Sequence, residues 1–265
     1  MLKVYLIQVD SEKGIKSKNL AKAKKMILDA RPTEGSLVLL PEMFATGYLP
    51  QSLADATEDF STNESGETAR MLSEVADSTR CSIMGAGITR ASDGFFNHIS
   101  LYTPDATNET CGYNKMNLFF PERKAFSPGK NINLFKIGDW KVASFICYDL
   151  RFPELFREAT IKGANLITIQ AAWPAKRKAH WETLLKARAI ENQVYIAAVN
   201  GVTMDPTHPI PLAGTSLIIS PNGEVIVEGP AQNEAVLTAE LDLQSEKEYR
   251  KSFPVLDGIV PPDLI

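Results

Sequence analysis

The feature that most limits the fold of this chain is an alternation of short apolar segments with segments of helical periodicity. Apolar segments of strand character occur at residues 4–9, 37–40, 81–88, 97–102, 142–147, 166–169, 194–199, 215–219, 225–228 and 235–241. Helical patterns occur at residues 20–28, 68–78 and 181–189, and between Pro153 and Gly163, residues typical of a helix start and of the position after a helix end. The pattern predicts a layered α/β fold with mixed sheets, in which Asp93 and Gly94 form a strand-to-strand turn.

The chain has 265 residues without an internal repeat, a low-complexity linker or a break in composition, so residues 1–265 are predicted to form a single domain. Its content of 44% hydrophobic and 23% charged residues is ordinary for a globular protein. The net charge of −4 and the lack of a basic tract argue against a nucleic-acid partner. No apolar run reaches the roughly 18 residues of a membrane span, so no membrane partner is expected.

The three cysteines are odd in number and widely spaced, which is unlike a disulfide framework. The first residues also lack the apolar core and the cleavage site of a signal peptide. Together these features predict a cytoplasmic protein. The Pro-rich, apolar segment from Phe253 to Ile265 is expected to pack against another surface, either of this chain or of a partner subunit.

Two segments place charged residues directly after segments of strand character, where α/β proteins place their sites. Glu42 follows four apolar residues and a proline, and a buried carboxylate is costly unless it has a partner or a proton. Lys115 lies in an aromatic, strand-like stretch, with Glu122 seven residues further on. Taken alone, Glu42 is better explained as a helix-cap or turn carboxylate, and Lys115 as an exposed residue of an edge strand.

Cys147 is expected to end a buried strand shortly before a helix begins, and a helix N-terminus favours the thiolate form of cysteine. Most free cysteines are small buried apolar residues. Here, however, Asp149, Arg151 and Glu154 follow within seven residues. This dense group of charges favours a functional cysteine. The three histidines have no metal-ligand spacing, so no metal site is predicted.

Taken in order, the three segments resemble the motifs of the carbon–nitrogen hydrolase (nitrilase) superfamily, which uses a Glu-Lys-Cys triad. Residues 41–44 are similar to its glutamate motif, residues 113–115 to its lysine motif and residues 147–149 to its nucleophile motif. Residues 42–48, 147–154, 172–174, 180–181 and 188–192 are similar to the omega-amidase branch. The resemblance implies a four-layer α-β-β-α sandwich, a homodimer, and no metal or organic cofactor.

The resemblance also implies an activity, the hydrolysis of the terminal amide of short dicarboxylate monoamides such as 2-oxoglutaramate and succinamate. Cys147 would be the nucleophile, Glu42 the general base, and Lys115 a donor to the tetrahedral oxyanion together with the backbone N–H of Tyr148. Glu122 would hold Lys115 or the substrate amide, unless it is a surface charge. The alternatives are another aliphatic, deaminated-glutathione or N-carbamoyl amidase, and a non-catalytic scaffold on the same fold.

The distal carboxylate of such a substrate requires a cation on the protein, and Arg151 is the best-placed candidate. An ion pair of Arg151 with Asp149 or Glu154 is nearly as plausible. Phe44 and Trp173 are expected either to wall the pocket, together with Tyr48, or to belong to the core. Asn117, a further candidate for substrate binding, stands where the family commonly has histidine; its amide can donate a hydrogen bond but cannot titrate. His180 is expected to be structural or to support a site residue, and Arg188 and Glu191 are expected to form a structural ion pair.

Overall fold

The computed structural model describes residues 1–60, 66–92, 94–104, 111–205 and 207–259, which form two six-stranded sheets packed face to face. The first sheet has the order β12-β1-β2-β3-β4-β5, with strands Ala235–Leu241, Leu2–Gln8, Leu37–Leu39, Ser82–Ala91, Gly94–Tyr102 and Cys111–Asn114. The second has the order β11-β10-β9-β8-β7-β6, with strands Val225–Glu228, Leu217–Ile219, Tyr195–Asn200, Leu166–Ala171, Trp140–Ile146 and Leu134–Ile137.

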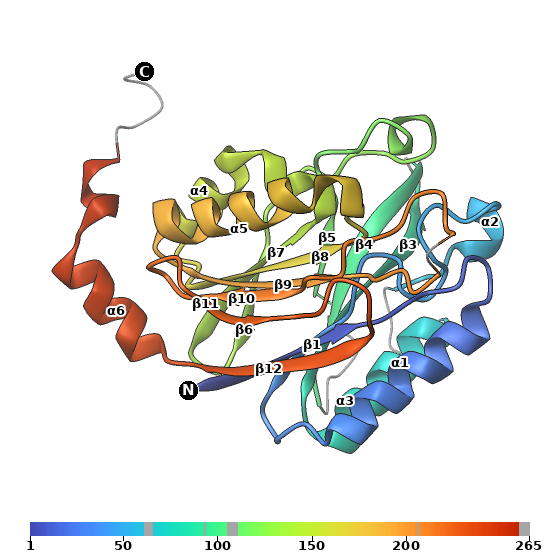
Figure 1. Cartoon of the computed structure of the whole chain (residues 1–265), viewed down its shortest axis with the longest axis horizontal. Coiled ribbons are helices and arrows are strands. Elements are labelled where there is room, and N and C mark those ends of the chain that lie inside the picture. The colour runs from blue at the N-terminus through green and yellow to red at the C-terminus, as the bar shows by residue number, and fades with distance from the viewer. Residues whose placement is uncertain (61–65, 93, 105–110, 206, 260–265) are drawn as a thin grey trace.

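Two pairs of helices cover the outer faces of the sheets. Helices α1 (Lys16–Ala30) and α3 (Glu67–Thr79) lie on the first sheet, and α4 (Pro153–Ile161) and α5 (Lys178–Asn192) lie on the second (Figure 1). The predicted four-layer α-β-β-α sandwich is therefore confirmed. Pro153 occupies the first position of α4 as expected, and Gly163 follows that helix with a φ of 99°.

The centre of each sheet is parallel and its edges are antiparallel. Strand β2 pairs in parallel with β1 and β3, and β8 pairs in parallel with β7 and β9. All six residues of β8 are buried, as expected for a parallel strand that is covered on both faces. Parallel strands end at the same edge of a sheet, so the loops after β2, β7 and β8 are available to form a site.

Apolar side chains of both sheets form the largest core cluster, and a second cluster fills the space between the first sheet and helices α1 and α3. Polar contacts also join the sheets. Ser144 of β7 donates to the Met84 sulfur of β3 at 3.2 Å, and Ser216 donates through its backbone and side chain to Gln8 Oε1 of β1. These directional contacts limit how the two sheets can slide past one another.

Some elements differ from the sequence-based predictions. Strand β6 and helices α2 (Leu53–Ala56) and α6 (Leu243–Ser252) were not anticipated; β6 is a short edge strand and α6 is strongly polar. Strand β5 ends at Asn114, so Lys115 follows this edge strand and does not lie within it as expected. Strands β3 and β4 meet at Gly94, whereas Asp93 lies outside the described residues. Among the residues that the structure describes, no helix has the length and apolar character needed to cross a membrane.

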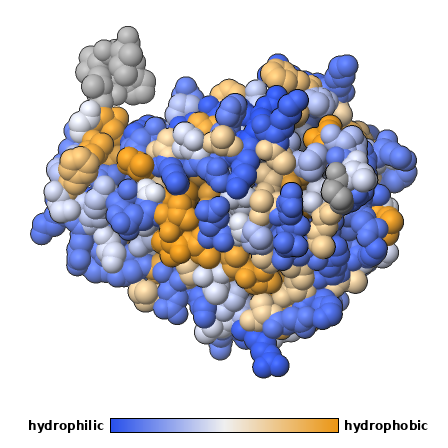
Figure 2. All heavy atoms as spheres, in the orientation of Figure 1, coloured by the Kyte–Doolittle hydropathy of each residue, from blue (hydrophilic) through white to orange (hydrophobic). Residues whose placement is uncertain are grey.

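The end of the described chain forms an arm that projects from the sandwich (Figure 1). Helix α6 leads into a short 3-10 helix, η4 (Val255–Gly258), and apolar atoms gather at this end of the arm (Figure 2). Phe253 and Val255 are 58% and 41% exposed. The Phe253 carbonyl accepts a hydrogen bond from Gln193 Nε2 at 2.8 Å, which ties the arm to the sandwich, but the two side chains remain exposed, and their packing against a partner subunit stays a prediction. Residues 260–265 lie outside the described residues.

Candidate active site

The residues of the three motifs lie on loops that meet at one edge of the sandwich. Glu42 follows β2, Lys115 follows β5, and Cys147 opens the 3-10 helix η2 (Cys147–Arg151) directly after β7. The loop after β8 joins them, because the backbone N–H of Ala172 donates to Glu42 Oε2 at 2.9 Å. The two sheets thus contribute to a single site.

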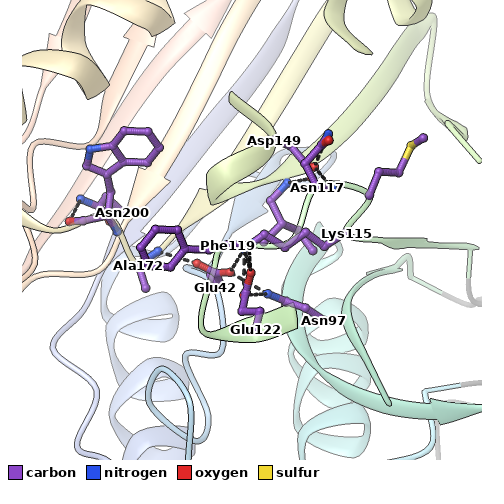
Figure 3. Close-up of polar contacts among 12 residues, drawn as sticks. Glu42, Asn97, Lys115, Asn117, Phe119, Glu122, Asp149, Ala172 and Asn200 are labelled. Atoms are coloured by element: carbon purple, nitrogen blue, oxygen red, sulfur yellow. Dashed lines mark hydrogen bonds and ion pairs between the residues drawn. The ribbon is translucent and has the colours of Figure 1, made fainter. Parts of the chain in front are cut away.

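A buried cluster of two carboxylates and one ammonium forms the centre of this site. Lys115 Nζ lies 2.9 Å from Glu42 Oε1 and 2.9 Å from Glu122 Oε1, and all three side chains are inaccessible to solvent (Figure 3). The backbone N–H of Phe119 donates to Glu122 Oε2 at 2.7 Å. Glu122 therefore contacts Lys115, which was one of the roles predicted for it, and it is not a surface charge.

The charges of this cluster support one another. Burial alone would lower the pKa of Lys115, but attraction to Glu42, Cys147 and Glu122 outweighs it and holds the pKa above the ordinary lysine value. The ammonium therefore stays charged in the folded protein. Burial raises the pKa of Glu122, although Lys115 opposes this effect. With both glutamates ionised, the cluster carries a net charge of −1 and can accept a proton.

Cys147 adopts a backbone conformation that L-residues rarely occupy, with a φ of 45°. Such strain is often found where a side chain must be aimed at a site. Burial raises the pKa of the thiol well above its ordinary value, and Glu42 adds to this effect while Lys115 opposes it. Burial is the largest influence on this thiol, and the favourable effect expected from a helix N-terminus stays a prediction. The buried thiol requires a base, and Glu42 is beside it.

The backbone N–H of Ala172 links the base to the nucleophile. It donates to Glu42 Oε2, and the same N–H lowers the pKa of the Cys147 thiol, although burial outweighs this effect. Trp173, the next residue, is held on both sides by Asn200: its N–H donates to Asn200 Oδ1 at 2.7 Å, and its carbonyl accepts from Asn200 Nδ2 at 3.3 Å. Asn200 thereby orients the loop that presents this N–H (Figure 3).

Asn97 of β4 is a member of the site that sequence reasoning missed. Its Nδ2 donates to Glu42 Oε1 at 2.6 Å and to Glu122 Oε1 at 3.1 Å, and its carbonyl accepts from the backbone N–H of Lys115 at 2.9 Å. The sequence does carry a signal. Asparagine is depleted in strands, and here it follows two phenylalanines in a segment that a buried strand would otherwise explain. A buried amide also needs partners.

Asp149 is buried beneath the nucleophile turn and accepts several hydrogen bonds. The donors are the Tyr113 hydroxyl at 2.8 Å, the Ile146 N–H at 3.0 Å, and the backbone N–H and Nδ2 of Asn117 at 2.7 and 3.2 Å. Burial raises the pKa of Asp149, and Lys115 opposes this effect. Asn117 thus contacts Asp149, and its predicted role in substrate binding remains a prediction.

Arg151 lies farther out and is stacked on aromatic rings. Its guanidinium carbon is 4.6 Å from the ring centroid of Trp173 and 5.7 Å from that of Tyr148. Its Nη1 lies 3.3 Å from Nδ1 of His180, so His180 contacts a candidate site residue, which is the second of the two roles expected for it. Within the part of the chain that the structure describes, no ion pair joins Arg151 to Asp149 or Glu154. The ion-pair alternative is therefore wrong, because Asp149 is used by other donors.

The predicted aromatic residues separate into two groups. Phe44 lies in the core cluster between the first sheet and its helices, where it approaches Gly85, which favours the core alternative. Trp173 is buried, and its indole N–H donates to the Arg177 carbonyl at 2.8 Å, but its ring supports Arg151 at the site. Burial, followed by the charges of Glu42, Glu122 and Cys147, raises the pKa of Tyr48, so its hydroxyl is near the cluster.

Arg188 and Glu191 form the predicted structural pair, with Arg188 Nη1 3.0 Å from Glu191 Oε1. Arg188 also donates through Nε and Nη2 to the Leu150 carbonyl at 3.2 and 2.9 Å. Since Leu150 belongs to η2, this buried arginine of α5 holds the turn that begins at Cys147. Arg188 is therefore a structural residue that stabilises the turn carrying Cys147.

Comparison with known proteins agrees with this geometry. The profile of the family described as carbon-nitrogen hydrolase matches residues 3–251. The chain belongs to the carbon-nitrogen hydrolase family. This carbon-nitrogen hydrolase is 36% identical over 261 residues to the 2-oxoglutaramate amidase of Bacillus subtilis (strain 168), covering 97% of this chain and 96% of that protein. It is 33% identical over 252 residues to the omega-amidase NIT2-B of Xenopus laevis, covering 91% and 89%.

Solved structures show the same fold. A CN-hydrolase superfamily protein from Xanthomonas campestris, with an arsenic adduct in its active site, has a TM-score of 0.87 at 29% identity and covers 98% of each chain. Nit3 of Saccharomyces cerevisiae, from branch 10 of the nitrilase superfamily, has a TM-score of 0.83 at 25% identity, with 96% of this chain and 94% of that chain covered. The nitrilase resemblance inferred from the motifs is thereby confirmed.

Proposed function

We propose that this carbon-nitrogen hydrolase cleaves the terminal amide of short dicarboxylate monoamides, of the 2-oxoglutaramate and succinamate type, to a carboxylate and ammonia. The observation that carries the proposal is the buried contact of Lys115 with both glutamates beside Cys147. The names of the 2-oxoglutaramate amidase and the omega-amidase among its relatives support the same substrate class.

The first half of the reaction forms a thioester. Glu42 accepts the proton of the Cys147 thiol, and the sulfur attacks the carbonyl carbon of the amide. The carbonyl oxygen becomes an oxyanion, which Lys115 Nζ and the backbone N–H of Tyr148 stabilise. An ammonium has three N–H bonds, and two of those on Lys115 are directed at Glu42 and Glu122, so one remains for the oxyanion. The C–N bond then breaks as protonated Glu42 donates its proton to the departing ammonia.

The second half hydrolyses the thioester. Ionised Glu42 removes a proton from water, the resulting hydroxide attacks the thioester carbonyl, and the same donors stabilise the second oxyanion. The C–S bond breaks, the sulfur takes the proton back from Glu42, and the acid is released. One water is consumed for each amide bond cleaved. Glu122 remains ionised throughout as a counter-charge that positions Lys115.

Arg151 is the proposed ligand of the distal carboxylate of the substrate. Aromatic rings of Trp173 and Tyr148 lie against its guanidinium, and Nη1 contacts His180, which leaves the other N–H groups for a ligand. A guanidinium can bind a carboxylate through two parallel hydrogen bonds. Burial lowers the pKa of Arg151, and a bound carboxylate would offset this cost. Trp173 and Tyr148 are thus substrate-side residues that act through Arg151.

The test is ammonia release from 2-oxoglutaramate, succinamate, glutamine and a neutral aliphatic amide, with the Cys147→Ala variant as the control. Turnover of the two dicarboxylate monoamides that is lost in the variant is the expected result. Preference for the neutral amide would retain the triad but contradict the substrate class. If no amide is turned over, the rate of thiol labelling distinguishes an unidentified acyl group from a scaffold, because a catalytic Cys147 reacts faster than buried Cys81.

We also propose that the enzyme works in the cytoplasm as a homodimer. A catalytic thiol must stay reduced, which suits a reducing compartment. Exposed Phe253 and Val255 offer apolar area that a second subunit can cover. Light scattering of the purified protein measures its mass; a value of one chain at micromolar concentration would contradict the dimer.

A further inference from the structure

The amide of Asn97 contacts both carboxylates of the cluster, and it does so from a strand that carries none of the three motifs. It is fully buried, and its Nδ2 lies 2.6 Å from Glu42 Oε1 and 3.1 Å from Glu122 Oε1. An NH₂ group has two protons, so it can donate one to each carboxylate. Lys115 Nζ approaches the same two oxygens. Two donors therefore separate two like charges.

The orientation of this amide is determined by its surroundings. If the amide were rotated by half a turn, Oδ1 would face two carboxylate oxygens and repel both. In the observed orientation Oδ1 is buried and has no hydrogen-bond partner among the described residues. A buried acceptor without a partner is unfavourable and is found where function requires it. The unpaired Oδ1 is therefore the energetic cost of an orientation that directs the NH₂ group at both glutamates.

The contact also makes the two oxygens of Glu42 different. Oε1 accepts from both Asn97 and Lys115, so its lone pairs are engaged. Oε2 accepts from the N–H of Ala172, the same N–H that lowers the pKa of the Cys147 thiol. Oε2 is therefore the carboxylate oxygen on the nucleophile's side.

We infer that Asn97 is a positioning residue for the reaction: its amide holds Oε1 of Glu42 and Oε1 of Glu122, offsets the repulsion between the two carboxyl groups, and leaves Glu42 Oε2 to exchange the proton with Cys147. This inference rests on the proposed function insofar as Glu42 is the base. It adds a fourth side chain to the machinery and assigns the proton transfer to one atom. Lys115 is held by the same residue, since its backbone N–H donates to the Asn97 carbonyl.

The test measures the rate at which iodoacetamide alkylates Cys147 as a function of pH, followed by mass spectrometry of the Cys147 peptide. This readout needs no knowledge of the substrate, so it separates failure of this inference from failure of the proposed function. In Asn97→Leu, a variant of similar volume, the carboxylates lose a donor and bind protons more tightly. The acid limb of the profile should move to higher pH by about one unit, and the rate near pH 6 should fall about tenfold.

Asn97→Asp provides a second variant of the same shape. It replaces the donor with a third carboxyl group, so the limb should move further than in Asn97→Leu, and kcat should fall more than KM changes. Ser100→Ala is the matched control, because Ser100 is buried on the same strand but contacts His98 instead of the cluster. Wild-type profiles in both Asn97 variants, or a rate loss without movement of the limb, would overturn the inference.

Discussion

The buried cluster of Glu42, Lys115 and Glu122 and the stacked guanidinium of Arg151 show two ways of keeping a charge inside one protein. In the cluster, each charge faces an opposite charge within 2.9 Å, and no side chain reaches solvent. Arg151 instead lies between aromatic rings and has no carboxylate partner among the described residues. The first arrangement is complete without a ligand and suits proton transfer, whereas the second is incomplete and suits recognition.

The comparison predicts the largest effect when the cluster is broken at Lys115. Lys115→Met removes an oxyanion donor and leaves two buried carboxylates facing each other. We expect kcat for ammonia release to fall about 10²–10³-fold and the free energy of unfolding in urea to fall by about 3–5 kcal/mol.

The matched control for that variant is Lys25→Met, since Lys25 forms an exposed ion pair with Asp29 one helical turn away. Its unfolding free energy should change by less than about 0.5 kcal/mol. Equal destabilisation by the two substitutions, or a kcat within tenfold of wild type for Lys115→Met, would contradict the distinction between buried and exposed pairs.

A smaller effect is expected at Arg151, and it should depend on the substrate. Arg151→Ala should raise KM for succinamate about 10–100-fold, because a charge-assisted hydrogen-bond pair is lost, while kcat and the turnover of a neutral amide stay nearly unchanged. Arg151→Lys should not restore affinity, because an ammonium cannot stack between rings as a planar guanidinium does.

Arg90→Ala is the control for stacking alone, because Arg90 lies over the Phe95 ring at 5.5 Å and is exposed. It should leave KM unaltered. A loss of turnover with every amide in Arg151→Ala would show that Arg151 serves the chemistry and not the recognition of the acyl group.

The smallest expected effect concerns stability at high pH. The pKa of Lys115 is raised in the folded protein, so the folded state holds its proton more tightly than the unfolded state does. The stabilisation is complete below the ordinary lysine pKa of about 10.4 and is lost as the pH rises above it. Urea unfolding between pH 9.5 and 11.5 should therefore show a steeper fall for wild type than for Lys115→Met. Parallel curves would indicate that Lys115 does not gain charge stabilisation on folding.

Much of the fold could be predicted because its signals are local. Residues 166–169 are all apolar or β-branched, and they lie in β8 as expected. Pro153 begins a helix because its fixed φ suits the first turn. The misses are also local in origin. Strand β6 has four residues at a sheet edge, and α6 has only polar residues over most of its length, so neither carries a periodic apolar pattern.

The site could be predicted only in part. Cys147 was expected to end a strand, but it begins η2 with a positive φ, which no residue pattern announces. Glu122 was expected to hold Lys115 or the substrate amide, with a surface charge as the alternative. The fold of residues 115–122 places it in contact with Lys115. For both Phe44 and Trp173 the alternatives were the pocket wall and the core. Phe44 packs in the core, whereas Trp173 belongs to a core cluster and also supports Arg151.

By itself, the sequence determined the layered α/β class and the order of Glu42, Lys115 and Cys147, because strand periodicity and motif residues are properties of neighbouring positions. The tertiary structure decided which of their atoms are paired. Asn97 and Ala172 reach Glu42 across 55 and 130 residues of chain. Hydrogen bonds and buried charges act through space over a few ångströms, so only the packing of the two sheets could bring those donors to the carboxylate.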